Sequence, residues 1–205
     1  MPTTLAYISA SLGYLPGSPR PSGQGAPLPA RSTIAGILGA ALGVDRGETE
    51  RLAQLAAELH WGVAILDRGA LVDRGAGDLV YTDLSRVRGP VLLASGLVAS
   101  SQPEDPNRAT PTSLRARPLR AGLRIILALD GGDWCAVLHA PRWPLALGSR
   151  ASLVDLRCQR LGRPLDTVLV RLARLGLEVW APGARHGVTV WSRGGITDTY
   201  ARVRP

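Results

Sequence analysis

Residues 119–129, which read LRAGLRIILAL, decide the fold class. Apolar side chains occupy every second position from Leu119 to Leu129, and Arg120, Gly122 and Arg124 stand between them in the first half. Successive side chains of a strand point to opposite faces of a sheet, so this alternation is typical of a β-strand. The elements on either side of residues 119–129 are therefore expected to pack around a sheet.

The chain before this strand predicts both strands and helices. Residues 5–11 and 61–65 alternate and are predicted strands. Between them, Ser32 or Thr33 can cap a helix that ends at Gly43. A second helix is predicted from Glu48 to Leu59. Apolar residues in both helices recur at intervals of three and four, which gives each helix one face to bury.

The chain after this strand predicts a short helix over residues 134–139, a loop over 141–150 and a helix over 166–175. Two strands follow, near residues 177–180 and 188–191, and the tail over 199–204 is extended. The pattern weakens between residues 84 and 118, which are rich in Arg and Pro. We interpret residues 84–118 as a projecting, thumb-like arm inserted in a single domain of residues 1–205.

This order predicts an α+β fold whose sheet carries its helices on one face. A ferredoxin-like core, of the kind found in RRM domains, fits the order of strands and helices, with further β-strands at the C-terminal end. The open face of such a sheet suits single-stranded RNA.

The charge balance indicates a polyanionic partner. The chain has 24 basic and 16 acidic residues, which gives a formal net charge of +8, and all of the basic residues are Arg. A GC-rich genome can explain the choice of Arg over Lys, but it does not explain the excess of positive charge. Guanidinium groups match phosphate oxygens and stack on bases, so the excess favours nucleic acid as the partner.

Cysteine usage and hydropathy favour a reduced, cytoplasmic protein. Cys135 and Cys158 stand far apart without a paired-cysteine motif, so neither a zinc site nor a disulfide framework is predicted. The N-terminal residues Met1–Thr4 lack the basic region of a signal peptide. The longest apolar runs are too short to span a bilayer, and we expect no membrane partner.

Residues 28–44, which read LPARSTIAGILGAALGV, are unusual for a generic helix. They are similar to the Pro-Thr-Lys/Arg-Ser…Gly-Leu-Leu-Gly-Ala-Ala-Leu-Gly signature of the CRISPR-associated Cas-five family, with Ala30 where the family has Thr. Residues 141–150, PRWPLALGSR, resemble the family's Pro-Arg-Tyr…Tyr-Leu-Gly-Arg-Arg segment, with Ser149 in place of Arg. The family's Asp-Tyr-His-Thr stretch is weakened here to residues 80–83. By length and helix spacing, the type I-E branch is the most similar.

The resemblance implies a non-catalytic RNA-binding subunit of a type I CRISPR Cascade, a surveillance ribonucleoprotein of antiviral defence. Members of this family belong to the RAMP superfamily, and they have a ferredoxin-like core and a thumb-like hairpin. They bind the 5′ handle of crRNA. The implied partners are crRNA, the Cas-seven backbone subunits that the protein caps and the Cascade large subunit, with target DNA reached only through the complex. We expect no cofactor and no metal.

Nine residues near helix ends, turns and the arm are candidate RNA contacts: Arg20, Arg31, Ser32, Thr33, Arg108, Arg115, Arg117, Gly148 and Arg150. A helix that starts at Ser32 offers free backbone N–H groups to a phosphate, and Arg31 stands beside it. Arg115 and Arg117 point the same way if the arm is extended, and Gly148 lets a backbone come close to RNA. The alternatives are a solvated Arg31 beside an ordinary cap, a solvated edge strand protected by charge at Arg115 and Arg117, and a turn residue at Arg150. Three aromatic residues are weaker candidates, as stacking platforms for bases: Tyr81, Trp143 and Tyr200.

The alternative function is metal-independent cleavage of precursor crRNA, as in relatives from type I-C systems. Such cleavage needs a general base and a general acid, usually His, Tyr or Lys. The chain has no Lys, and His60, His139 and His186 share no motif. We therefore expect no enzymatic activity. A plainer third hypothesis is a basic RNA-binding domain outside CRISPR.

Overall fold

The computed structural model describes residues 1–13, 28–45, 47–71, 82–86, 91–92, 98–99, 112–116, 120–147, 153–183, 186–191 and 197–205. The chain divides into two compact units, each described by itself below. One unit contains Met1–Leu71 and Leu119–Pro205, and the other contains Val72–Pro118.

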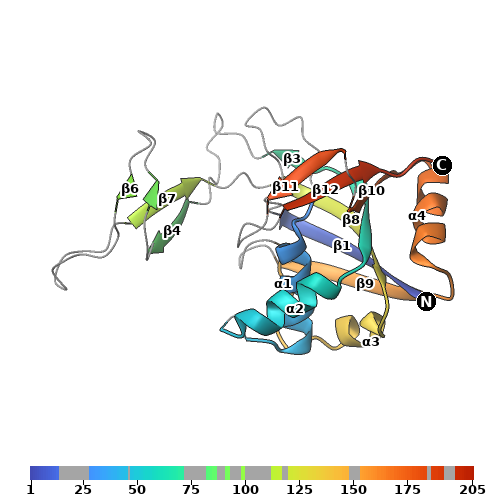
Figure 1. Ribbon diagram of the computed structural model, residues 1–205, viewed down its shortest axis with the longest axis horizontal. Helices are drawn as coiled ribbons and strands as arrows, with labels where there is room; N and C mark the ends of the chain where they lie inside the picture. The colour runs from blue at the N-terminus through green and yellow to red at the C-terminus, as the bar shows by residue number, and fades with distance from the viewer. Residues whose placement is uncertain are drawn as a thin grey trace. The chain divides into compact units, whose positions relative to one another are not determined.

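Over its described residues, the larger unit is an antiparallel sheet with four helices (Figure 1). Its elements are β1 (Thr3–Gly13), α1 (Arg31–Leu42), α2 (Thr49–Glu58), β2 (Trp61–Asp67), β3 (Ala70–Leu71), β8 (Arg120–Asp130), α3 (Trp134–His139), β9 (Val154–Leu161), α4 (Leu165–Arg174), β10 (Glu178–Pro182), β11 (Val188–Trp191) and β12 (Thr197–Arg202). Seven strands follow the order β11-β12-β10-β2-β8-β1-β9, and β3 pairs with β8 beside β2. The predicted α+β class is confirmed.

Strand β8 lies at the centre of this sheet and has an apolar row on each face. Leu123, Ile125, Leu127 and Leu129 belong to one core cluster, whereas Ile126 and Ala128 belong to a second cluster on the opposite face. A strand that is buried on both faces loses the polar alternation of a half-buried strand. This explains why the second half of residues 119–129 is apolar throughout.

The helices cover both faces of the sheet, so the prediction of helices on one face is wrong. Helices α1, α2 and α3 contribute to the first core cluster, which includes Ile34, Ala56 and Leu138. Helix α4 packs Val168 and Leu169 against the second cluster, on the other face. The apolar stripe of α4 was visible in the sequence, but a stripe does not reveal which face of a sheet it covers.

Helix α1 begins one residue earlier than its predicted cap. Its N-cap is Ala30, and neither Ser32 nor Thr33 caps the helix, because Arg31 already has helical geometry. Leu28 and Ala30 are fully buried. Burial of this entry segment fixes the helix start in place of a polar cap. The predicted end at Gly43 is confirmed, with the left-handed backbone (φ 74°) that Gly adopts without strain.

Strand β9 is absent from the sequence-based prediction. It pairs with β1 at the edge of the sheet, with Cys158 opposite Ala6. Its residues alternate between partly buried and exposed positions. Because Asp155, Arg157 and Arg160 interrupt its apolar residues, the segment resembles a polar connection more than a strand.

The described residues of the smaller unit form two antiparallel strand pairs. Strands β4 (Thr82–Arg86) and β7 (Thr112–Ala116) pair with each other, and β5 (Val91–Leu92) pairs with β6 (Val98–Ala99). The predicted arm, residues 84–118, falls within this unit. That the larger unit is a ferredoxin-like core and the smaller unit a thumb hairpin stays a prediction. Within the described ranges, no helix is both long and apolar enough to cross a bilayer.

Candidate nucleic-acid interface

Arg31, the first residue of α1, ties three elements of the fold together. Its guanidinium donates to the Asp198 carboxylate on β12, with Nη2–Oδ1 at 2.9 Å and Nε–Oδ1 at 3.0 Å. Its Nη1 donates to the carbonyl oxygens of Ala56 (2.8 Å) and Leu59 (3.0 Å), which end α2. Arg31 thus caps the C-terminal end of one helix while it pairs with a carboxylate. These internal bonds favour a structural role for Arg31, and its predicted contact with RNA stays a prediction.

Tyr200 lies beside this ion pair and is fully buried. Its hydroxyl donates to the carbonyl oxygen of Pro29 at 2.6 Å, and its ring meets Trp61 edge-on at a centroid distance of 5.5 Å. Burial and the neighbouring Asp198 carboxylate raise the pKa of Tyr200 far above its usual range. A buried ring has no face to offer a base, so Tyr200 holds the entry to α1 and does not stack on RNA.

The two sequence stretches that resemble the Cas-five family lie against each other. The backbone N–H groups of Arg142 and Trp143 donate to the carbonyl oxygens of Ala41 and Ala40, both at 3.1 Å, at the end of α1. A Cβ on Gly43 would collide with the Arg142 side chain. The end of α1 and residues 142–143 therefore lie together at one place on the molecule. Trp143 at this place is 53% exposed and available for stacking.

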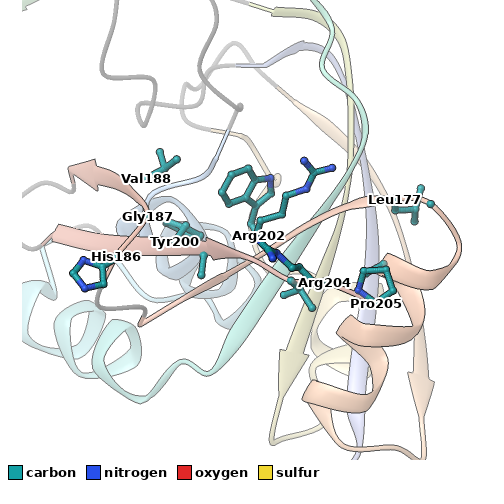
Figure 2. A pocket seen from close by; sticks show the side chains of 13 residues that line it. Leu177, His186, Gly187, Val188, Tyr200, Arg202, Arg204 and Pro205 are labelled. Atoms are coloured by element: carbon teal, nitrogen blue, oxygen red, sulfur yellow. The ribbon is translucent and has the colours of Figure 1, made fainter.

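A groove of about 660 Å³ runs between β10, β12 and the end of α4 (Figure 2). Its basic side chains are those of His186, Arg202 and Arg204, all of which are exposed. Val188, Leu177 and Pro205 supply apolar lining. A groove with two guanidinium groups and an imidazole can bind phosphate oxygens. From the sequence, an extended tail is expected to place Tyr200, Arg202 and Arg204 on one face. Arg202 and Arg204 line this groove, whereas the Tyr200 side chain is buried.

A polar part of the sheet on the α4 side forms a second candidate surface. Tyr7 and Ser9 of β1 line a hollow of about 430 Å³ together with Asp155 and Arg157 of β9. Tyr7 stands directly opposite Arg157 in the register, which puts an aromatic ring next to a cation. Sequence reasoning missed these residues because it missed β9. One feature of the sequence could have indicated this surface. Within residues 5–10, Tyr7 and Ser9 are polar and alternate with apolar residues.

The remaining predicted RNA contacts lie mostly outside the described residues. These are Arg20, Arg108, Arg117, Gly148 and Arg150, and the same holds for Tyr81. Arg115 lies on β7, opposite Asp83 of β4 in the register. Ser32 and Thr33 lie in the first turn of α1, and both are half-buried. All of these contacts stay predictions.

A family model described as CRISPR-associated protein (Cas_Cas5) matches residues 21–163 of the chain. The chain belongs to the Cas-five family. The match includes both of the stretches that suggested this family from the sequence. A search of curated proteins finds no relative.

Solved structures are similar to this Cas-five protein over nearly its whole length. One is described as "Crystal structure of Cas protein", with a TM-score of 0.55, 19% identity, and coverage of 98% of this chain and 94% of the other. A second is a chain of a "CRISPR RNA-guided surveillance complex", with a TM-score of 0.54, 19% identity, and coverage of 98% and 89%. At this identity the likeness shows a common fold.

The histidines of this Cas-five chain are separated in the structure. His60 precedes β2, His139 ends α3 and His186 precedes β11. Each is exposed. His186 is the histidine that lines the basic groove, whereas His139 faces two thiols. Among the described residues, therefore, no two histidines stand on one element as an acid–base pair.

Proposed function

We propose that this protein is the non-catalytic RNA-binding subunit of a type I CRISPR Cascade complex. It binds the 5′ handle of crRNA and caps the Cas-seven backbone. The observation that carries the proposal is membership of the Cas-five family, together with a fold shared end to end with a chain from an RNA-guided surveillance complex. The net charge of +8 fits a partner made of phosphates.

The proposed RNA contacts fall into two sets. The first is the predicted set of arginines and helix-start residues, of which Arg115 and Arg117 on the arm are the most direct to test. The second consists of Arg202 and Arg204 in the groove, where the structure adds a basic lining to what the sequence suggested. The surface at the end of α1 adds Trp143 as a stacking side chain.

The first experiment asks whether the protein assembles around crRNA. The chain is co-expressed with the Cas-seven and large subunits of its own system and a matching CRISPR array, and is then purified by a tag on the chain. The proposal expects several Cas-seven copies and a crRNA with one uniform 5′ end. Recovery of mixed cellular RNA without Cas-seven would instead support a general RNA-binding domain.

The second experiment measures how binding to the 5′ handle depends on salt. For single strands, each lost phosphate contact lowers the slope of log K against log salt by about 0.7. We therefore expect Arg115→Ala with Arg117→Ala to flatten the slope by about 1.4. The matched control is Arg171→Ala with Arg174→Ala, which removes the same charge from the exposed surface of α4. If both double variants flatten the slope equally, the change comes from net charge alone, and a specific contact of Arg115 and Arg117 with RNA is contradicted.

The alternative function is metal-independent processing of precursor crRNA, as in type I-C relatives. One observation favours testing it: His186 lies in the same groove as Arg202 and Arg204, where an imidazole could meet a ribose and the guanidiniums a phosphate. The purified complex is incubated with repeat RNA in chelator. Specific cleavage that is lost in His186→Gln but kept in His60→Gln would establish the alternative and overturn the non-catalytic proposal.

A further inference from the structure

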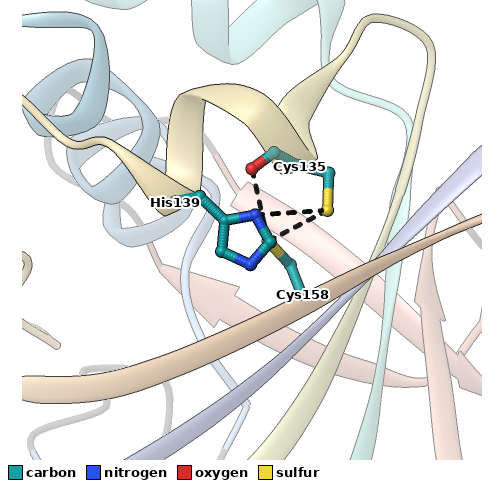
Figure 3. A group of neighbouring side chains, drawn as sticks. All are labelled: Cys135, His139 and Cys158. Carbon is teal, nitrogen blue, oxygen red and sulfur yellow. Dashed lines mark hydrogen bonds between the residues drawn. The ribbon is translucent and has the colours of Figure 1, made fainter.

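Cys135, His139 and Cys158 come together at the edge of the sheet, although 23 residues separate the two cysteines (Figure 3). Cys135 and His139 are one helical turn apart on α3, so their side chains emerge from the same face. Cys158 reaches them from β9. The sequence predicted no zinc site here, because the spacing lacks a paired-cysteine motif and β9 was not predicted.

The distances between these groups are compatible with a shared metal ion. The Cys135 and Cys158 sulfurs are 3.2 Å apart, and Cys135 Sγ lies 3.8 Å from His139 Nδ1. All three ligand atoms lie within 4.8 Å of one another. Tetrahedral zinc, with Zn–S of about 2.3 Å and Zn–N of about 2.0–2.1 Å, separates its ligand atoms by about 3.5–3.8 Å. Small movements of the side chains would complete this geometry.

The donor set also selects the metal. Two thiolates and an imidazole are soft to borderline ligands, which favour zinc over magnesium or calcium. Asp133 is nearby, but its carboxylate accepts the N–H of Ala136 at the start of α3 and lies 3.9 Å from Arg160. Among the described residues, this leaves water as the fourth ligand, and exposed His139 leaves that position open to solvent.

We propose that Cys135, His139 and Cys158 bind one Zn²⁺ ion, which ties α3 to the edge strand β9. This site is independent of the proposed RNA-binding function. At this location, a bound ion would stabilise α3 and the segment that follows it. Helix α3 has only six residues, and the chain that leaves it packs against the end of α1 through Arg142 and Trp143. A metal clip on α3 would fix the start of this connection.

Cobalt substitution tests the site directly. The full-length chain is reduced, stripped of metal and titrated with Co²⁺. We expect one equivalent to produce a thiolate-to-cobalt charge-transfer band and the visible bands of tetrahedral cobalt, and Zn²⁺ to displace both. Absence of the charge-transfer band, or a spectrum of octahedral cobalt, would overturn the proposal.

Two variants assign the ligands. His139→Gln changes an exposed side chain, so the fold should persist, and we expect at least a tenfold weaker affinity for Zn²⁺. Cys158→Ser should abolish or halve the charge-transfer band. The matched control, His60→Gln, removes another exposed histidine and should bind like the original chain. Full affinity in His139→Gln, or an equal loss in His60→Gln, would contradict the assignment.

A thiol assay separates a metal site from a disulfide. The sulfurs at 3.2 Å are too far apart for a bond of about 2.05 Å but close enough to form one after oxidation. With Zn²⁺ bound, we expect both thiols to resist mild oxidant and to become reactive after addition of chelator. Oxidation at the same rate with and without Zn²⁺ would show a simple dithiol and refute the metal site.

Discussion

At the residue scale, the pairing of Arg31 with Asp198 joins positions that are 167 residues apart. The side chains are 19% and 7% exposed, so water screens this pair far less than an ion pair on the surface. From the sequence, Arg31 was a candidate phosphate contact because it stood at a helix start. Local reasoning could not find Asp198, since no pattern in residues 28–44 indicates which distant strand supplies a partner.

Loss of the carboxylate at Asp198 should strongly destabilise the protein. Asp198→Asn leaves the Arg31 charge partly buried without its partner, at a cost of about 3–5 kcal/mol. The control is Arg51→Gln, which breaks the exposed pair with Glu48 and should cost less than about 1 kcal/mol. Urea unfolding of the three proteins provides the comparison. Similar midpoints for both variants would show that the Arg31 pair contributes no more than a surface contact.

Tyr200 should make the protein sensitive to alkali. Its folded-state pKa is raised by burial, whereas the unfolded chain releases the proton near pH 10. The folded state therefore holds the proton that the unfolded state loses, and the free energy of unfolding falls by up to about 1.4 kcal/mol per pH unit above 10. Below pH 10 this contribution is fully present.

The test is to compare Tyr200→Phe with the original chain in urea at pH 8, 10 and 11. At pH 8 the variant should be less stable by about 1 kcal/mol, because the hydrogen bond to Pro29 is lost. At pH 11 the gap should close or reverse, because Phe cannot ionise. A gap that stays constant across this range would mean that Tyr200 titrates normally in the folded protein.

At the element scale, elements with a strong period were predictable and an edge strand was not. Residues 119–129 and the helix near 166–175 carry regular apolar spacing, and β8 and α4 form there. Strand β9 mixes charged and apolar residues because one of its faces is solvent-exposed. Because β9 was not predicted, neither the surface that contains Tyr7 and Arg157 nor the approach of Cys158 to Cys135 and His139 could be predicted.

The contact between α4 and β2 depends on Gly62. A Cβ at this position would lie 2.6 Å and 2.7 Å from the two methyl groups of Leu169, which is itself buried in α4. Gly62→Ala should push α4 away from the sheet and cost about 1–3 kcal/mol. Thermal unfolding gives the measurement.

Gly36→Ala is the matched substitution for this test. Nothing lies within 4 Å of a Cβ at Gly36, which is an exposed position inside α1. Alanine should therefore stabilise the helix by about 0.5–1 kcal/mol relative to glycine. The prediction for Gly62 is wrong if both substitutions shift the melting temperature in the same direction.

At the scale of the whole molecule, both core clusters consist of residues of the larger unit, among the residues whose burial the structure describes. Leu71 on β3 pairs with Arg120 on β8, so the two chain ends that enter the smaller unit are neighbours in one antiparallel ladder. The sequence indicated an arm by its weak pattern and its prolines. It could not indicate that the arm leaves and returns at paired strands, because β3 has only two residues.

The larger unit should therefore fold without the smaller one. Replacement of residues 72–119 by Asn-Gly converts β3 and β8 into a tight hairpin, since this dipeptide favours the required turn. We expect a cooperative thermal transition like that of the full chain and, under the proposed function, at least tenfold weaker binding to the crRNA handle. A shortened chain that unfolds without cooperativity would show that the smaller unit supports the core.

The place of β12 in the sequence has a consequence for biosynthesis. Asp198 and Tyr200 are translated long after the segment that they anchor at residues 29–31. Until β12 is synthesised, the Arg31 guanidinium between α1 and α2 lacks the Asp198 carboxylate. A truncated product that ends before residue 198 therefore lacks the bonds that fix the start of α1, and we expect proteases to degrade it faster than the full chain.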